Sequence, residues 1–185
     1  ADIIRDNASS ILPLICFAKH EEVNEDNKSS VELWLDLWND VSFGDSMLQL
    51  YLDDIIIVLD STLNSQSWLL KAQSGSSIAS IAKRLDANLK DEGRVKLVEL
   101  VLANISGRTF LGKERLVEAL AALSSKASSK ELTNRLIEAV LRECRKDEDI
   151  YKTKVLKSLG DILGKLEEEN RFEDVYNIVW PLLDK

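Results

Sequence analysis

Proline and glycine are scarce in this sequence, and aromatic residues are few. Among 185 residues there are 2 prolines and 7 glycines, and aromatic side chains make up 6%. A protein built of many short strands needs more turn residues than this. The scarcity argues against a β-rich fold and favours helices, while an apolar fraction of 45% is enough to bury a core.

Cysteines and long apolar runs are also few. Cys16 and Cys144 each lie inside an apolar helical pattern with no second Cys or His at metal-ligand spacing, so we expect buried thiols and a reducing environment. The longest apolar run, residues 55–59, is far shorter than the ~20 residues that span a bilayer, and no basic-then-apolar signal opens the chain. We expect a soluble protein of the cytoplasm and nucleus, without membrane insertion.

Positive charge is lacking in the first half of the chain. The formal net charge is -8, and residues 1–92 hold 7 Lys and Arg against 16 Asp and Glu, whereas residues 93–185 hold 17 against 16. Nucleic acids and anionic membranes demand a positive field, so the acidic half argues against both as partners. The partners that we expect are proteins.

The sequence repeats with a period of about 42 residues. Pro13 and Pro181 are 168 residues apart, four times 42, and the residues around them are similar: Ile-Leu-Pro-Leu-Ile and Val-Trp-Pro-Leu-Leu. Steps of 42 from Pro13 reach three further apolar helical segments, at Ile55, Leu97 and Ala139. Helix pairs that repeat every ~40–47 residues are typical of HEAT and armadillo arrays, in which each unit packs mainly on its neighbours.

A second register runs through the alternate helices. Lys71, Lys113 and Lys152 are each followed by a branched apolar residue at +7, a small residue at +8 and another apolar residue at +10. These nine positions are Ile78, Leu120 and Leu159; Ala79, Ala121 and Gly160; and Ile81, Leu123 and Ile162. Large residues that flank a small one on one helix face predict that a neighbouring helix approaches closely there.

These patterns predict an all-α, HEAT-type α-solenoid of about four helix pairs plus one further helix. The expected repeats are 2–42, 45–88, 91–127 and 130–167, with a half repeat at 171–184. Their helices are expected at 2–20 and 29–42, 45–64 and 66–88, 91–106 and 112–127, 130–146 and 149–167, and 171–184. Because no polar capping repeat is evident, we expect a fragment of a longer chain.

Local signals mark several helix boundaries. Ser29 with Glu32 and Ser128 with Glu131 have the Ser-x-x-Glu spacing of a capping box. Gly107 follows a predicted helix and is expected to adopt the left-handed conformation of a helix end.

No motif for catalysis, cofactor binding or metal binding is found. The single histidine, His20, stands beside Glu21 and Glu22, and we expect it to be solvated and charged at a helix end. The segment 107–114 matches the Gly-x4-Gly-Lys of a phosphate loop, but Glu114 replaces the Ser or Thr that binds magnesium. Acidic runs lack the spacing of a calcium loop. The sequence therefore predicts a protein that is not an enzyme.

Aromatic residues recur at the short turns between paired helices, at Trp68, Phe110 and Tyr151. Turns along one edge of a solenoid form a continuous ridge, which often binds partners. Two interpretations stay open: the rings fill the junctions between repeats, or they contact a partner. The partner-binding residues that we expect are Trp68, Arg108, Thr109, Phe110 and Lys113.

Three stretches, 65–73, 106–114 and 139–146, resemble the large HEAT-repeat adaptor and scaffold of the proteasome in their order and spacing. The resemblance covers most of residues 45–185 and is weaker over 1–44. It implies a non-catalytic role in which the protein binds proteasomes, tethers core particle to regulatory particle and takes part in proteasome quality control. Two alternatives remain: a tubulin-binding HEAT array that regulates microtubules, and a segment of a nuclear transport receptor.

Overall fold

The computed structural model describes residues 6–40, 44–125, 128–166 and 172–183, and within these ranges every regular element is a helix. The predicted all-α architecture is therefore confirmed. In chain order the elements are α2 (Ala8–Ala18), α3 (Lys28–Asn39), α4 (Asp45–Leu50), α5 (Leu52–Leu63), α6 (Trp68–Leu85), the short 3₁₀ helix η1 (Asp86–Asn88), α7 (Asp91–Asn104), α8 (Glu114–Leu123), α9 (Lys130–Cys144), α10 (Asp149–Leu166) and α11 (Phe172–Leu183).

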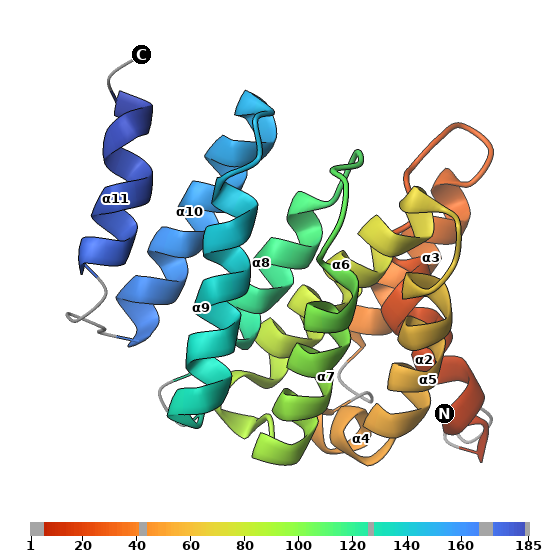
Figure 1. The fold of residues 1–185 in the computed structure, drawn as a ribbon. Helices are drawn as coiled ribbons and strands as arrows, with labels where there is room; N and C mark the ends of the chain where they lie inside the picture. Colours follow the sequence, from red (N-terminus) through yellow and green to blue (C-terminus); the bar gives the residue numbers. More distant parts are fainter. Residues whose placement is uncertain (1–5, 41–43, 126–127, 167–171, 184–185) are drawn as a thin grey trace.

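The helices alternate between two layers (Figure 1). Helices α5, α7 and α9 lie side by side in the first layer, and α6, α8 and α10 form the second layer behind them. Helix α2 packs against α3, α5 and α6, and α11 lies beside α9. One hydrophobic cluster extends from Ala8 to Ile162 through both layers. A core shared between successive helix pairs is the arrangement of an α-solenoid, as the period predicted.

The residues at +7 and +10 from Lys71, Lys113 and Lys152 form the buried face of the second layer. The apolar residues at +7 and +10 are at most 2% exposed: Ile78, Leu120, Leu159, Ile81, Leu123 and Ile162. The small residues Ala79 and Ala121 are also buried, whereas Gly160 is exposed, so the expected close contact is not made at that position. The register therefore identifies the buried face of all three helices.

The closest approach between helices lies at Gly75 in the middle of α6. A Cβ atom at this position would lie 2.8 Å from the carbonyl carbon of Arg115 and 2.9 Å from the backbone nitrogen of Leu116 in α8. Contacts between α6 and α8 are more extensive than those between any other two described helices. Glycine is needed at this position because only a hydrogen atom fits between the two backbones.

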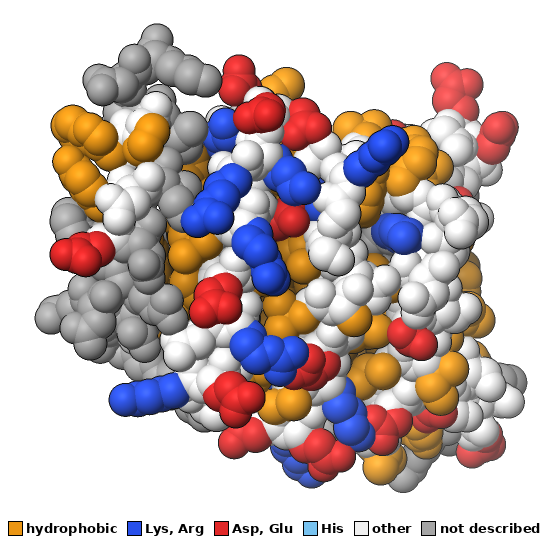
Figure 2. All heavy atoms as spheres, viewed as in Figure 1, with side chains coloured by type: hydrophobic (Ala, Val, Ile, Leu, Met, Phe, Trp, Pro, Cys, Tyr) orange, Lys and Arg blue, Asp and Glu red, His pale blue; other side chains and the backbone are white. Residues whose placement is uncertain are grey.

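Exposed ion pairs also link the helices of the first layer. Lys96 Nζ lies 2.9 Å from the Asp53 carboxylate, and the guanidinium of Arg135 donates to the Glu99 carboxylate at 2.7 Å. Figure 2 shows acidic and basic side chains mixed over α7 and α9. Exposed ion pairs each contribute about 0–1 kcal/mol, so the hydrophobic cluster shared by both layers contributes more to holding the repeats together.

The structure corrects several predicted boundaries. The helix expected at 45–64 is divided into α4 and α5 by Tyr51, whose ψ of 17° is not helical. Asp53 and Asp54 then lie in the first turn of α5, where carboxylates are favourable. The expected helices at 2–20, 29–42, 112–127 and 171–184 are observed as α2, α3, α8 and α11, and residues 1–5, 41–43, 126–127, 167–171 and 184–185 lie outside the described ranges. The repeat boundaries themselves stay a prediction.

The two predicted capping boxes are wrong by one or two residues. Ser29 lies inside α3, which begins at Lys28 after Asn27. The N-cap of α9 is Ser129 and not Ser128, and its hydroxyl accepts a hydrogen bond from the Leu132 N–H at 3.2 Å. Gly107 has the predicted left-handed conformation, with φ of +97°.

The contact at Gly75 predicts a large effect of a small substitution. Gly75→Ala should lower the free energy of unfolding by about 1–3 kcal/mol, because the added methyl group forces two backbones apart. Gly160→Ala is the matched control: a Cβ there meets nothing within 4 Å, and alanine should stabilise α10 by roughly 0.5–1 kcal/mol. Chemical denaturation measures both, and equal effects would contradict the close approach of α6 and α8.

Candidate functional site: the turn edge

Three turns lie along one edge of the solenoid, at the top of Figure 1. They are residues 64–67 between α5 and α6, residues 105–113 between α7 and α8, and residues 145–148 between α9 and α10. We call these turns, with the first residues of the helices that follow them, the turn edge. Four of the five predicted partner-binding residues are at least partly accessible here: Trp68 and Arg108 are exposed, and Thr109 and Phe110 are half-buried.

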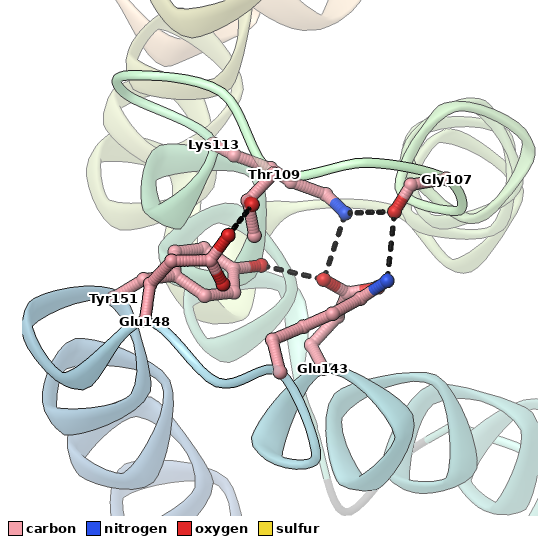
Figure 3. A network of polar contacts seen from close by, with 7 residues as sticks. Gly107, Thr109, Lys113, Glu143, Glu148 and Tyr151 are labelled. Carbon is pink, nitrogen blue, oxygen red and sulfur yellow. Dashed lines mark hydrogen bonds and ion pairs between the residues drawn. The ribbon is translucent and has the colours of Figure 1, made fainter.

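The fifth predicted residue, Lys113, is not accessible to a partner, in contrast to the prediction. Its side chain is completely buried, and its ammonium lies 2.8 Å from the Glu143 carboxylate in the next repeat. It also donates a hydrogen bond to the Gly107 carbonyl at 3.2 Å (Figure 3). Lys113 therefore holds two repeats together and does not present its charge to a partner.

Tyr151 completes this buried network. Its hydroxyl donates to the Glu143 carboxylate at 2.7 Å, so the carboxylate accepts from both the lysine and the tyrosine. Buried charges are tolerated only when they are paired and hydrogen-bonded in this way. Glu143 was not singled out from the sequence; the one available signal is its place between the buried residues Leu141 and Cys144, on a helix face where a carboxylate needs a partner.

The environment shifts the proton affinities of the network. Burial lowers the pKa of Lys113, and the hydrogen bond from its ammonium to Glu143 opposes that effect. Burial, together with the bond to Glu143, raises the pKa of Tyr151 far above its ordinary value. The phenol therefore remains a hydrogen-bond donor throughout the physiological pH range.

Two further contacts connect neighbouring turns near the surface. The Lys146 ammonium donates to the Gly107 carbonyl at 2.9 Å, so this carbonyl accepts from two lysines. The Thr109 hydroxyl donates to the Glu148 carboxylate, and this bond lowers the pKa of Glu148. Figure 3 shows that these residues converge from turn 105–113 and from the turn before α10. The two turns are thus fixed relative to each other.

Glycine shapes the same turn. Gly112 has φ of +91°, and a Cβ at this position would lie 2.6 Å from the Cβ of Ala72 in α6. Turn 105–113 therefore rests on the first turns of α6 on one side and is bonded to turn 145–148 on the other. The turn edge is continuous across three repeats.

The aromatic residues at these turns divide between the two interpretations. Tyr151 is buried and Phe110 packs against the hydrophobic core, so both fill the junctions between repeats. Trp68 is 42% exposed and is accessible to a partner.

Among the described residues, no group of three or more His, Cys, Asp and Glu side chains could hold a metal ion. The phosphate-loop-like segment 107–114 uses its lysine to bind Glu143, so the ammonium is not directed at a phosphate. No helix in the described ranges is long and apolar enough to cross a membrane.

The environment of His20 also differs from the prediction of a solvated, charged side chain. It is half-buried, and its Nε2 has no hydrogen-bond partner among the described residues. Burial, with the nearby charges of Lys19 and Arg115, lowers its pKa to about 4, so the imidazole is neutral at pH 7 and not charged as expected. Lys19 is also buried; its ammonium lies 3.2 Å from the centre of the Trp38 ring and donates to the Ser80 hydroxyl at 2.6 Å.

The titration of His20 can be measured directly, because it is the one histidine in the chain. Its imidazole resonances in NMR should titrate near pH 4. The unfolded chain, with a pKa near 6.5, binds more protons between these values, so this residue should make stability fall as pH drops from about 6.5 to 4. A midpoint near 6.5, or an unchanged pH dependence of stability in His20→Gln, would contradict the buried neutral form.

The buried ion pair predicts strong coupling between Lys113 and Glu143. Lys113→Met should cost about 3–5 kcal/mol of stability, since it leaves a carboxylate buried without its cation. The double variant Lys113→Met/Glu143→Gln should recover at least half of that loss. The surface pair of Lys154 and Glu114, also between repeats, is the control: Lys154→Met should cost less than about 1 kcal/mol. Additive single and double effects in denaturation would refute the network.

Comparison with known proteins gives the family. The model for "ECM29, C-terminal ARM-like repeats" matches residues 119–185. The chain is 48% identical over 185 residues to the proteasome-associated protein ECM29 homolog of Drosophila melanogaster, and 35% identical over 198 residues to the proteasome adapter and scaffold protein ECM29 of Homo sapiens. In both cases all of this chain is covered.

A more distant relative is the proteasome component ECM29 of Saccharomyces cerevisiae, which is 29% identical over 125 residues, or 66% of the chain. No solved structure matches the chain. The chain spans 10% of the length of the fly and human relatives. The whole-chain similarity, the match to ARM-like repeats and the helical solenoid agree, and the chain belongs to the ECM29 family.

Proposed function

We propose that this chain is a segment of a proteasome-binding adaptor and scaffold. The observation that carries the proposal is the whole-chain similarity to proteins named as proteasome adaptors and proteasome-associated proteins. In this proposal the protein tethers core and regulatory particles, acts in proteasome quality control and works inside the cell, in cytoplasm and nucleus. The similarity to these relatives favours the proteasome as the partner over the two alternatives, in which the chain belongs to a tubulin-binding array or to a nuclear transport receptor.

The structure supports a binding role rather than a catalytic one. The buried polar residues Lys113, Glu143 and Tyr151 join neighbouring repeats. A stack of helices presents an extended surface for partners. Binding of a partner along this surface is the role that this arrangement serves best.

Within the chain, we propose that the turn edge contacts the proteasome. Trp68 and Arg108 project from it, and Thr109 and Phe110 are partly accessible. Exposed aromatic and arginine residues are the types that contribute most to protein interfaces. The contacts that fix turn 105–113 reduce the ordering cost of binding.

The proposal is tested with full-length protein and purified proteasomes. Arg108→Glu should weaken binding about fivefold, roughly 1 kcal/mol, because it reverses an exposed charge at the interface. Lys83→Glu, at the far end of α6, makes a similar change on an exposed residue and should leave affinity unchanged. Binding is measured by quantitative co-sedimentation. A wild-type protein that does not bind proteasomes would refute the function, and equal effects of the two variants would refute the location.

A further inference from the structure

Lys19, at the end of α2, has a buried ammonium that no described carboxylate neutralises. Its side chain is 5% exposed, and its polar contacts are the Ser80 hydroxyl of α6 and the face of the Trp38 ring of α3. Lys113, the other buried lysine in the described ranges, has the Glu143 carboxylate 2.8 Å from its ammonium. Because a buried charge without a counter-charge is costly, the environment of Lys19 needs an explanation.

A second cation shares the Trp38 ring. The guanidinium carbon of Arg84, in α6, lies 4.6 Å from the ring centre, and its Nη1 donates to the Trp38 carbonyl at 2.5 Å. The Asp45 carboxylate lies 3.7 Å from Arg84 Nε and forms no ion pair with Lys19. Two cations thus lie against one aromatic ring, and the one carboxylate paired here is beside Arg84. Like charges at such a site repel each other more strongly than in water.

Trp38 connects α3 to the next repeat. Helices α2 and α3 lie at the end of the stack that is farthest from α11 (Figure 1). Helix α3 packs mainly against α2, and its contacts with the other described helices are sparse. Its Leu33 and Leu35 are exposed, whereas Trp38 reaches both Lys19 and α6. The charge of Lys19 therefore acts on the residue that joins α3 to α6.

Few titratable groups act on Lys19. Cys16 and His20 lie beside it in sequence, Arg84 faces it from α6, and α3 presents the uncharged ring of Trp38. Burial raises the pKa of the Cys16 thiol to about 12 and lowers that of His20 to about 4, so both are neutral at pH 7. The carboxylates of α3, its C-cap and α5 make no ion pair with Lys19: Glu32, Asp36, Asp40, Asp53, Asp54 and Asp60. Arg84 is the charge that remains.

Opposing effects determine the protonation of Lys19. The ring face and the end of α2 favour the ammonium, whereas burial and the charge of Arg84 favour the neutral amine. Burial is the largest effect, and it lowers the pKa of Lys19 to about 7. If α3 moves away, the amine reaches water and its pKa returns towards its ordinary value. The open form then binds more protons between the two pKa values, so opening becomes harder as pH rises through this range.

We infer that Lys19, Trp38 and Arg84 form a proton-sensitive latch between α3 and α6. The neutral Lys19 amine, bonded to Ser80, leaves Arg84 as the one cation on the ring and keeps the latch closed. Protonation of Lys19 adds a second buried cation and weakens the hold on α3. Arg84 stays charged throughout and supplies the constant repulsion. The inference goes beyond the proposed function, because it concerns the attachment of one helix and not the identity of a partner.

The first test measures hydrogen–deuterium exchange of the full-length protein at pH 7 and pH 8.5, corrected for the intrinsic pH dependence of exchange. Between these values His20 is neutral and Cys16 stays largely protonated even when exposed, so Lys19 is the group at the latch that titrates. Protection of residues 31–38 should rise about 15-fold, because the pKa of Lys19 changes from about 7 to 10.5 on opening. Protection that does not rise would overturn the inference.

The second test fixes the charge of Lys19 in two opposite ways. Lys19→Met removes the charge and should reduce the pH effect on α3 to less than twofold. Lys19→Arg keeps a cation at both pH values, so the rise should again be absent and protection at pH 8.5 should be lower than in wild type. His20→Gln is the matched control at the neighbouring position and should keep the 15-fold change. Circular dichroism checks the helical content of each variant. A pH effect that persists in Lys19→Met, or that disappears in His20→Gln, would assign the proton to another group and contradict the latch.

Discussion

The close approach of α6 and α8 at Gly75 determines the geometry on which the remaining contacts depend. With only a hydrogen atom between Gly75 and the backbone of Arg115, the second-layer helices lie at short distance and bury the residues of the repeat register. This distance brings turn 105–113 onto the start of α6, where Gly112 meets Ala72. The exposed ion pairs of the first layer are too weak to impose such a spacing.

The turn edge follows from this packing. Once α8 is placed, Lys113 at its start is enclosed and needs an anionic partner, which Glu143 of the next repeat supplies. Glu143 and Tyr151 meet that need, and in doing so they fix the turn before α10 against the turn before α8. A buried polar network thus sets the positions of side chains that project into solvent above it. These contacts tie together the turns of the surface that we propose for proteasome binding.

The repeat architecture could be predicted from the sequence because it depends on apolar residues at periodic positions. Ile78, Leu120 and Leu159 recur at fixed distances from a lysine, and burial at one position implies burial at the others. The place of Trp68 beside a turn between paired helices was predicted from the recurrence of aromatic residues at such turns, and the structure puts it at the start of α6. The boundary at Tyr51 was not predicted, because an unbroken apolar pattern hides a short interruption.

The roles of single polar residues could not be predicted in this way. Lysine is almost always exposed, so Lys113 was assigned to the surface; its burial depends on Glu143, 30 residues later, and no local pattern reports that pairing. His20 was expected to be charged because Glu21 and Glu22 follow it, but burial and the charges of Lys19 and Arg115 determine its state. Contacts between repeats decide these cases, and a single sequence does not reveal them.

The central claim is that the turn edge of this segment is a preformed surface that contacts the proteasome. Hydrogen–deuterium exchange of the full-length protein, free and bound to purified proteasomes, tests it most directly. The account predicts slower exchange on binding in residues 105–112 and 145–151, with no change in the exposed faces of α5 and α7. Protection confined to α5, α7 and α9, or no protection anywhere in residues 44–166, would contradict it.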